Sequence, residues 1–320
     1  MAREQLGICA EANLHASYLL FNALEGQEAL LRQKLARIPL LLARLAEHFS
    51  ETQLTGVVAI GANYWDSLYP GARPRGLQAF PFAANDNLAL AEVWADLLIV
   101  VRSDRLDVNY IACQQICQLV KPHVDLLEQL QGFRYLDGRD LTGFIDSPQN
   151  PRGSRKRKLA LIDPSNQPVF AAGSYLHLQR WHYDLLHWQQ LDISQQEEIM
   201  GMSKIEGSLL QPPRLLANSH ALSSRLGEEA NLPLLLMQNM PFAEQNSHGL
   251  ISVSYASEPD SFSLQFGYQL GYQTAGQLKE QQPANQYDLF FDYCHADLCA
   301  AFFAPSLSFL EMACRPDNKS

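Results

Sequence analysis

The chain has 320 residues, of which 47% are hydrophobic, and it carries a formal net charge of -10 at pH 7. This length allows one large domain or two of ordinary size, and the hydrophobic fraction excludes an intrinsically disordered chain. The acidic charge argues against nucleic acid and anionic membranes as main partners, and the one dense basic run, residues 152–158, is short enough to be a solvated loop or helix start.

The first half of the chain alternates between strand and helix patterns. Short apolar runs predict strands, and a helical spacing of apolar residues predicts helices. Residues 63–81 are rich in glycine and proline, so this segment is predicted to be irregular. The predicted elements are strands at 15–22, 54–60, 94–101 and 132–136, and helices at 26–48 and 106–127. Their order is typical of a ferredoxin-like unit, in which helices cover one face of an antiparallel sheet.

The second half looks like a looser copy of the first. Its predicted elements are strands at 169–181 and 249–255, helical segments at 182–201 and 257–270, and a final strand and helix within 299–312. We therefore predict an α+β protein made of two ferredoxin-like repeats, residues 8–150 and 151–314. Each sheet alone would expose an apolar face to water, so the two antiparallel sheets are expected to pack together.

The cysteines and the start of the chain indicate the compartment. Cys113 and Cys117 have the i, i+4 spacing of a helix, but no histidine or further cysteine follows them at the distance typical of a zinc site. We predict that all six cysteines are free thiols in a reducing compartment. The N-terminus lacks an apolar signal core, and no run of about 18 apolar residues occurs. The protein is therefore expected to be soluble and cytoplasmic.

Residues 132–151 read GFRYLDGRDLTGFIDSPQNP, which is too charged for a core strand and too apolar for an ordinary loop. This segment resembles the signature of the dye-decolorising peroxidases, whose common form is GFxDGxxNP. Further matches follow in the family's order and cover nearly the whole chain: AGSYLHLQRW at 172–181, GMSK at 201–204, NSH at 218–220, QNMPF at 238–242, HGLISVSYA at 248–256 and AAFFAPSLSFL at 300–310.

This resemblance implies a fold, a cofactor and substrates. The family is built from two ferredoxin-like halves and binds haem b in the second half, so one haem per chain is expected. Hydrogen peroxide and small aromatic electron donors, such as dyes and phenols, are the implied substrates. A homo-oligomer, either a dimer or a larger ring, is also implied.

On the proximal side of the haem, the resemblance implies a histidine ligand to the iron. His220 in the NSH motif matches this ligand, although by itself it would be one of nine histidines and most often structural. Such a ligand usually donates its other ring N–H to a carboxylate. Asp288 and Asp292 are the candidates for this carboxylate, and Asp292 aligns better with the family pattern. A surface aspartate on a helix remains the alternative for Asp292.

On the distal side, Asp146 and Asn239 match the family's aspartate and asparagine. Peroxide must lose a proton from one oxygen, and the other oxygen must gain a proton before the O–O bond breaks. A carboxylate within hydrogen-bonding reach can move that proton. Phe144 and Ile145 are expected to keep Asp146 poorly hydrated, which raises the pKa of a carboxyl group. The alternative is an aspartate that only caps a turn, because Asp-Ser-Pro is common turn chemistry.

Several positions depart from the family pattern. Met237 stands where the distal arginine is expected, two residues before the asparagine, and methionine offers no hydrogen-bond donor. Ser147 replaces the usual glycine after the aspartate, which affects the turn that orients this side chain. Met202 takes the place of the arginine in the GR-x-K motif. Ser223 occupies the usual arginine position after the histidine, with Arg225 as a possible substitute.

The loss of positive charge leaves Arg180 and Lys204 to pair with the haem propionates, although either residue could be an ordinary surface residue. Two interpretations follow. In the first, the protein is a haem peroxidase weakened by Met237, with Asp146 acting alone. In the second, it is a catalytically inactive haem-binding, sensing or assembly protein of the same fold. A third idea is that Met237 is a sixth ligand to the iron. The alternative is that Met237 only packs beside the haem.

Three aromatic residues lie in the haem-side segments and could relay electrons to bulky donors at the surface. Trp181, Tyr183 and Trp188 have strand and helix spacing, however, and residues in such positions are more often part of the core. No phosphate loop, nucleophile elbow or zinc signature competes with the haem interpretation.

Overall fold

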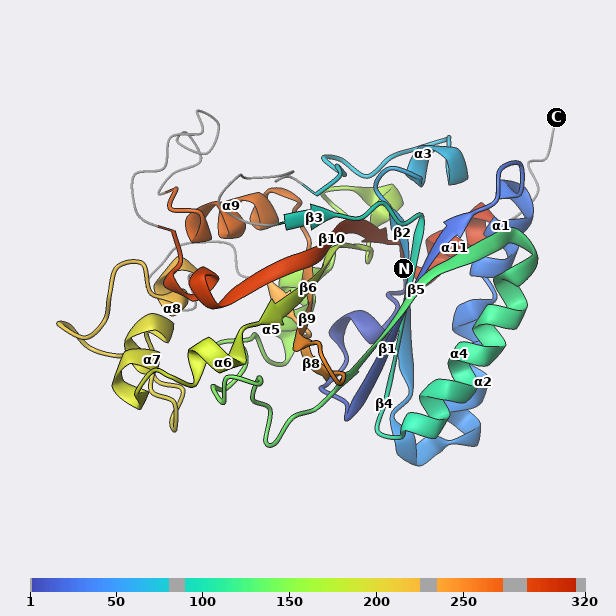
Figure 1. Ribbon diagram of the computed structural model, residues 1–320. Coiled ribbons are helices and arrows are strands. Elements are labelled where there is room, and N and C mark those ends of the chain that lie inside the picture. The colour runs from blue at the N-terminus through green and yellow to red at the C-terminus, as the bar shows by residue number, and fades with distance from the viewer. Residues whose placement is uncertain (1, 81–89, 225–234, 273–286, 315–320) are drawn as a thin grey trace.

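The structure is a computed structural model that describes residues 2–80, 90–224, 235–272 and 287–314. A 10-stranded sheet forms the centre of this described part (Figure 1). The strands are β1 (His15–Ala23), β2 (Thr55–Gly61), β3 (Leu90–Glu92), β4 (Leu97–Ser103), β5 (Val124–Phe133), β6 (Ser174–Tyr183), β7 (Leu236–Met237), β8 (Met240–Ala243), β9 (His248–Ala256) and β10 (Cys294–Ala304). The main path is β5-β1-β4-β2-β10-β6-β9-β7, while β3 pairs with β10 and β8 with β9.

Helices lie at both ends of this sheet. In Figure 1, α1, α2, α4 and α11 cover the strands of the first half, and α6 to α9 lie beside the strands of the second half. The helices are α1 (Glu28–Leu35), α2 (Ile38–His48), α3 (Trp65–Leu68), α4 (Leu106–Val120), α5 (Ser154–Ala160), α6 (Leu185–Trp188), α7 (Ile193–Met200), α8 (His220–Ser223), α9 (Asp260–Gln269) and α11 (Leu307–Ala313). Short 3-10 turns are η1 (Leu6–Cys9), η2 (Ser50–Thr52), η3 (Lys121–His123), η4 (Pro168–Phe170) and η5 (Leu289–Tyr293).

Each half contributes its own antiparallel strands, and one strand pair joins the halves. In the first half, β1 pairs with β4 and β5, and β2 pairs with β4. In the second half, β6 lies between β9 and β10. The junction is the antiparallel pairing of β2 with β10, where Ile60 lies opposite Phe303. The α+β architecture predicted from the sequence is confirmed.

Strand β4, in the first half of the sheet, is buried on both faces, and its side chains alternate between two cores. In β4, Leu98 and Val100 face a core that also contains residues of the second half, such as Leu178 and Val253. The intervening residue Ile99 faces a second core, beneath the helices of the first half. The two halves therefore pack their inner faces together as predicted, and they are also continuous at the β2–β10 edge.

Several predicted elements differ from the structure, and the helix predicted at 26–48 is two helices, α1 and α2. The helix predicted at 106–127 ends at Val120, because Pro122 lacks a backbone N–H and lies in the 3-10 turn that follows. The next strand is β5, which begins at Val124, whereas the sequence predicted a strand at 132–136. The strand predicted from residue 94 begins at Leu97. The strand predicted from residue 169 begins only at Ser174, because Ala172 has a left-handed φ of 60° that turns the chain.

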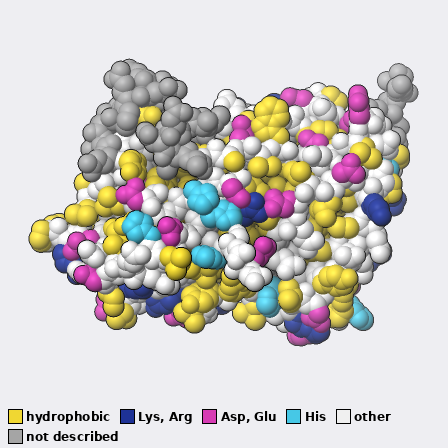
Figure 2. Space-filling view, viewed as in Figure 1, with side chains coloured by type: hydrophobic (Ala, Val, Ile, Leu, Met, Phe, Trp, Pro, Cys, Tyr) yellow, Lys and Arg dark blue, Asp and Glu magenta, His cyan; other side chains and the backbone are white. Residues whose placement is uncertain are grey.

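The division into residues 8–150 and 151–314 remains a prediction. Within the described residues, no helix combines the length and the apolar character that a membrane crossing requires. On the face of the molecule shown in Figure 2, acidic, basic and histidine side chains are interspersed with apolar ones.

Candidate active site

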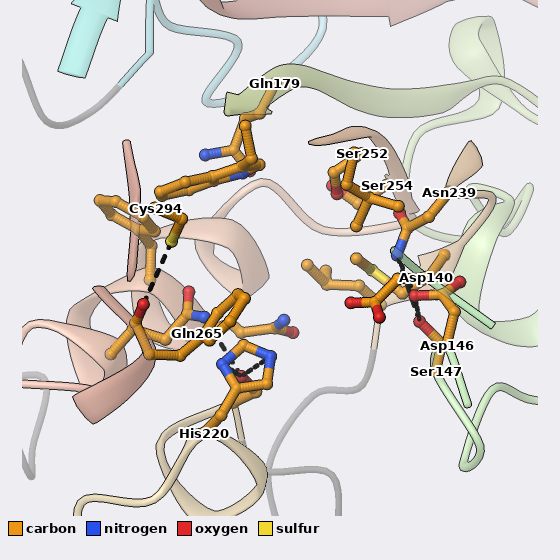
Figure 3. A pocket seen from close by; sticks show the side chains of 18 of the residues that line it. Asp140, Asp146, Ser147, Gln179, His220, Asn239, Ser252, Ser254, Gln265 and Cys294 are labelled. Carbon is orange, nitrogen blue, oxygen red and sulfur yellow. Dashed lines mark hydrogen bonds between the residues drawn. The ribbon is translucent and has the colours of Figure 1, made fainter. Parts of the chain in front are cut away.

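A cavity with about 1090 Å³ of space free of protein atoms, its open side included, lies on the outer face of the second-half strands. Alternate residues of β6 from His177 onward, and of the middle of β9, face this cavity, as strand alternation requires. These residues are His177, Gln179, Trp181 and Tyr183 from β6, and Leu250, Ser252 and Ser254 from β9. Figure 3 shows His220 on one side of the cavity and Asp140, Asp146 and Asn239 on the opposite side.

His220 begins helix α8, and its ring is fixed by a carboxylate. Its Nδ1 lies 2.7 Å from Oδ2 of Asp288. Burial by itself lowers the pKa of His220, but the charge and hydrogen bond of Asp288 outweigh burial, so the pKa lies above its usual value. Because Nδ1–H donates to Asp288, Nε2 of the neutral ring carries the lone pair, and the Ser224 hydroxyl lies 3.5 Å from it. This tautomer presents a free nitrogen ligand at the cavity.

Asp288 is fully buried and is held by its own turn. Its side chain caps the 3-10 turn η5 by accepting from the backbone N–H of Phe290, while its Oδ2 remains for His220. The backbone N–H of Leu289 also donates to the carbonyl of Asn218, which ties this turn to the segment before His220. The histidine and its carboxylate are thus positioned as one unit.

The preference for Asp292 as the partner of His220 was wrong. Asp292 is exposed and accepts a hydrogen bond from the Tyr287 hydroxyl at 2.8 Å. It lies four residues after Asp288, on the solvent side of the same turn. A signal in the sequence favoured Asp288: an aspartate directly before an apolar turn is a preferred capping residue.

Asp146 lies across the cavity from His220 and accepts two hydrogen bonds. Asn239 donates from Nδ2 to its Oδ1 at 2.8 Å, and the Ser147 hydroxyl donates to the same oxygen at 3.1 Å. Burial raises the pKa of Asp146 above its usual value, and the two donated hydrogen bonds offset part of this effect. Oδ1 of Asn239 is buried and has no hydrogen-bond partner in the described residues.

The backbone at Ser147 explains why a glycine is usual at this position. Its φ is 45°, in the left-handed region that a side chain disfavours. The Ser147 hydroxyl compensates by bonding to Asp146 and by accepting from Nδ2 of Asn239 at 3.3 Å. The serine therefore keeps the turn and adds a donor to the carboxylate.

Asp140 is a second buried carboxylate that the sequence analysis did not single out. Its Oδ1 accepts from the backbone and the hydroxyl of Thr142, and its Oδ2 accepts from the Tyr183 hydroxyl at 3.3 Å. Burial, opposed by the Thr142 bonds and reinforced by the charge of Asp146, raises the pKa of Asp140 to about 6. The Asp-Leu-Thr pattern predicts a turn with a fixed carboxylate, but it contains no sign of the burial.

Met237 lines the same wall as Asp146, and its backbone is held on both sides by Asn150. The Asn150 Oδ1 accepts from the Met237 N–H at 3.0 Å, and its Nδ2 donates to the Met237 carbonyl at 2.7 Å. This pair of bonds attaches the asparagine of the Asn-Pro signature to the segment that contains Asn239. The distal positions named from the sequence are therefore brought together around one cavity.

The expected propionate partners do not line the cavity. Arg180 points to the opposite face of β6, where it pairs with Asp297 and Glu128, because only the odd-numbered residues of this strand face the cavity. Lys204 donates to Gln196 at 2.7 Å and lies over the ring of Phe144. Among the described residues, neither lysine nor arginine contributes to the lining.

The remaining departures from the family pattern have different surroundings. Met202 is buried and lines the cavity. Ser223 is buried, and its backbone N–H donates to the carbonyl of Ser219 within the turn of α8. Arg225, the possible substitute for a missing arginine, lies outside the described residues.

The three aromatic residues considered for electron relay belong to one core cluster beside the cavity. Trp181 stacks on Phe291 with 5.4 Å between the ring centroids, and Trp188 packs edge-on against Phe290. Tyr183 bonds to Asp140 and has a pKa well above its usual value, because of burial. A relay through these rings remains a prediction.

The residues present fit a flat, apolar group with one axial nitrogen ligand. The cavity walls are mainly aromatic and aliphatic. Nε2 of His220, whose contact with the Ser224 hydroxyl is long at 3.5 Å, lies on one side, and Asn239, whose Oδ1 has no partner among the described residues, lies on the opposite side. His177, which burial holds neutral with a pKa lowered to about 3, stacks on Phe262 and adds to the apolar wall. Amides and hydroxyls, such as Gln265 and Ser252, are the available partners for acidic side groups.

Comparisons with known proteins agree with this geometry. The family model of the Dyp-type peroxidase N-terminal domain matches residues 5–134, and the model of the C-terminal domain matches residues 137–309. A dye-decolorizing peroxidase of Mycobacterium tuberculosis is 28% identical over 287 residues, which cover 89% of this chain and 83% of that protein. The crystal structure of a protein from Shewanella oneidensis assigned to the Dyp-type peroxidases is 35% identical and has a TM-score of 0.90. The match covers 98% of this chain and 99% of that chain.

A variant of Rhodococcus jostii DypB in complex with heme shares the fold at 24% identity, with a TM-score of 0.85 over 94% of this chain and 96% of that chain. The two family models together span almost the whole chain. The protein therefore belongs to the Dyp-type peroxidases, a family of haem enzymes.

Proposed function

We propose that this chain binds one haem b in the cavity and oxidises small aromatic donors, such as dyes and phenols, with hydrogen peroxide at a reduced rate. The observation that carries the proposal is the His220–Asp288 pair, which faces the Asp146–Asn239 pair across an apolar cavity. A nitrogen ligand on one side and a proton acceptor on the other are the two groups that peroxide reduction at haem requires.

His220 is the residue that would hold the iron, through Nε2. The carboxylate of Asp288 fixes the ring and makes the imidazole more electron-rich, as in other metal-bound histidines. When bound, haem would supply the redox chemistry by which peroxide is reduced and the donor oxidised. The buried aromatic walls would exclude bulk water from this chemistry.

The proton transfer is assigned to Asp146. Its carboxylate would accept a proton from one peroxide oxygen and return it to the other, which leaves as water. Asn239 holds the carboxylate with its Nδ2, and its unpartnered Oδ1 would accept a hydrogen bond from a peroxide O–H. The Ser147 hydroxyl bonds to the same carboxylate oxygen and keeps it oriented.

Met237 is the reason to expect reduced activity. Methionine has no hydrogen-bond donor, so it cannot stabilise the negative charge that develops when peroxide is deprotonated. The loss of one such donor costs about 2.7–4 kcal/mol of transition-state stabilisation, or roughly a hundredfold to a thousandfold in rate.

A catalytically inactive haem-binding, sensing or assembly protein is the second candidate. It is favoured by the methionine at position 237 and by the lack of lysine and arginine among the described lining residues. Under either function we place the chain in the cytoplasm, because its six cysteines are unpaired, and we expect a homo-oligomer by resemblance to the family.

Haem titration of the purified chain tests the proposal. The wild type and a His48→Ala control, which removes an exposed histidine of α2, are expected to show the visible absorption of histidine-bound haem. His220→Ala is expected to lose this spectrum and all peroxide-dependent oxidation of a phenol. Haem uptake without any such oxidation favours the inactive candidate. If the wild type takes up no haem, or if His220→Ala keeps the spectrum, the proposal is wrong.

A further inference from the structure

A second cavity lies behind the distal wall of the candidate active site. It contains about 1150 Å³ of space free of protein atoms, its open side included. The two cavities share the wall formed by residues 145–148, Met237 and Asn239. The second cavity is bounded on its far side by the first half of the chain, through residues 10–13, the end of β4 and the segment after β5.

Arg102 lies at the floor of this second cavity and forms no ion pair within the described part of the chain. It is the penultimate residue of β4, its side chain is on the inner face with Leu98 and Val100, and it is only 3% exposed. Its Nη1 donates to Oε1 of Gln238 at 2.6 Å. Its Nε is buried without a hydrogen-bond partner, and no carboxylate of the described residues lies within 4.0 Å of the guanidinium.

A buried guanidinium without a counter-ion is unusual. Charges are retained in protein interiors when they are paired, because the loss of hydration is otherwise uncompensated. The charge of Arg102 lowers the pKa of two neighbouring buried phenols, Tyr18 and Tyr255, although burial raises both by more. Neither hydroxyl has a hydrogen-bond partner in the described part of the chain, so neither compensates for the charge.

The rim of the cavity adds further positive charge. Arg134 and Arg152 are exposed lining residues, and neither forms an ion pair with a described carboxylate. The other two cations of the lining are already paired: Arg139 with Asp137 at 3.0 Å, and Lys156 with Glu11 at 2.8 Å. Three arginines that form no ion pair with a described carboxylate therefore surround one cavity in a chain of net charge -10. Among the described lining residues, Asp146 is the one carboxylate outside the two pairs.

We propose that this second cavity binds a small oxyanion, a carboxylate or phosphate group, with Arg102 as the anchor at its floor and Arg134 and Arg152 at its rim. With Nη1 bonded to Gln238 and Nε buried, Nη2 is the nitrogen of Arg102 left to donate to an oxyanion, and the guanidinium charge strengthens this contact. The inference does not depend on haem binding, because none of these three arginines lines the candidate active site.

Titration of the full-length chain, with and without haem, tests this site. The probes are inorganic phosphate, benzoate and the neutral isostere benzamide, and binding is measured by calorimetry at two salt concentrations. We expect saturable, salt-sensitive binding of phosphate or benzoate and no binding of benzamide. Tighter phosphate binding identifies a free inorganic anion as the ligand class, and tighter benzoate binding identifies an aromatic carboxylate; both results support the proposal.

Two arginine variants separate an anion site from a structural role. Arg102→Met is expected to weaken anion binding at least tenfold and to raise the unfolding temperature in anion-free buffer, because it removes an uncompensated buried charge. Arg44→Met, which removes an exposed charge from α2, is the matched control and is expected to change neither property. If Arg102→Met does not fold, Arg152→Gln at the rim replaces it, with an expected weakening of several-fold.

The proposal is overturned if neither anion binds the wild type, or if the variants bind as tightly as the wild type. It is also overturned if Arg102→Met unfolds at a lower temperature while anions leave the wild-type unfolding temperature unchanged. That result would show that the guanidinium only supports the fold. Because the titration is made with and without haem, failure here leaves the proposed peroxidase function untouched.

Discussion

The buried carboxylate of Asp140 makes the stability of this protein depend on pH. Asp140 is 6% exposed, and burial is the main reason that its pKa is about 6 in the folded chain, compared with 3.8 for an ordinary aspartate. The folded state therefore holds the proton more tightly than the unfolded state. The contribution of this group to stability is full below pH 4, is lost as the pH rises from about 4 to 6, and stays constant above that value.

The size of this effect follows from the difference between the two pKa values. A difference of about two units corresponds to about 3 kcal/mol, since one unit is equivalent to about 1.36 kcal/mol. Asp140→Asn removes the titration and keeps the shape of the side chain. Its Oδ1 can still accept from Thr142, and its Nδ2 can donate to the Tyr183 hydroxyl. We expect the stability of the variant relative to wild type to rise by about 2–3 kcal/mol between pH 4 and pH 8.

Urea unfolding of the haem-free chain, followed by tryptophan fluorescence at pH 4, 6 and 8, measures this difference. Asp125→Asn, which removes an exposed carboxylate of β5, is the control for the loss of one acidic side chain. If the Asp140→Asn difference is the same at pH 4 and pH 8, the carboxyl group titrates normally and the reasoning fails. Only the change with pH is diagnostic, since any altered hydrogen bond contributes equally at each pH.

Three other substitutions, with Asp292→Asn as a control, test the candidate active site. Asp288→Asn is expected to weaken haem binding roughly 10-fold to 100-fold in a spectroscopic titration, while Asp292→Asn leaves it unchanged; equal effects of both would contradict the assigned pair. Met237→Arg is expected to accelerate peroxide-dependent oxidation of a phenol by roughly a hundredfold to a thousandfold, and an unchanged rate would mean that the missing donor is not the limitation. Asp146→Asn should lower kcat/KM for peroxide by roughly a hundredfold to ten-thousandfold. Because only the carboxylate accepts a proton, wild-type kcat/KM should rise with pH through the raised pKa of Asp146, and a profile shared with the variant would exclude this role.

Much of the fold follows from local patterns. The apolar run of β4 has no polar residue before Arg102, which predicts a strand buried on both faces, and the helical spacing after residue 106 predicts α4. The Asn-Ser-His and Asn-Pro motifs identify the site because they are contiguous in the chain. Such short-range information survives in any single sequence, since it depends only on neighbouring residues.

The tertiary structure decided the features that depend on which segments meet. Asp288 and Asp292 are four residues apart, and only the packing of the turn η5 against the segment before His220 determines which carboxylate reaches the ring. Arg180 lies in a matching motif, but the orientation of β6 points it away from the cavity. The separation of Arg102 from the carboxylates of the described residues is likewise a property of the assembled halves. Burial and pairing over long sequence distances depend on the whole fold, and no local pattern records them.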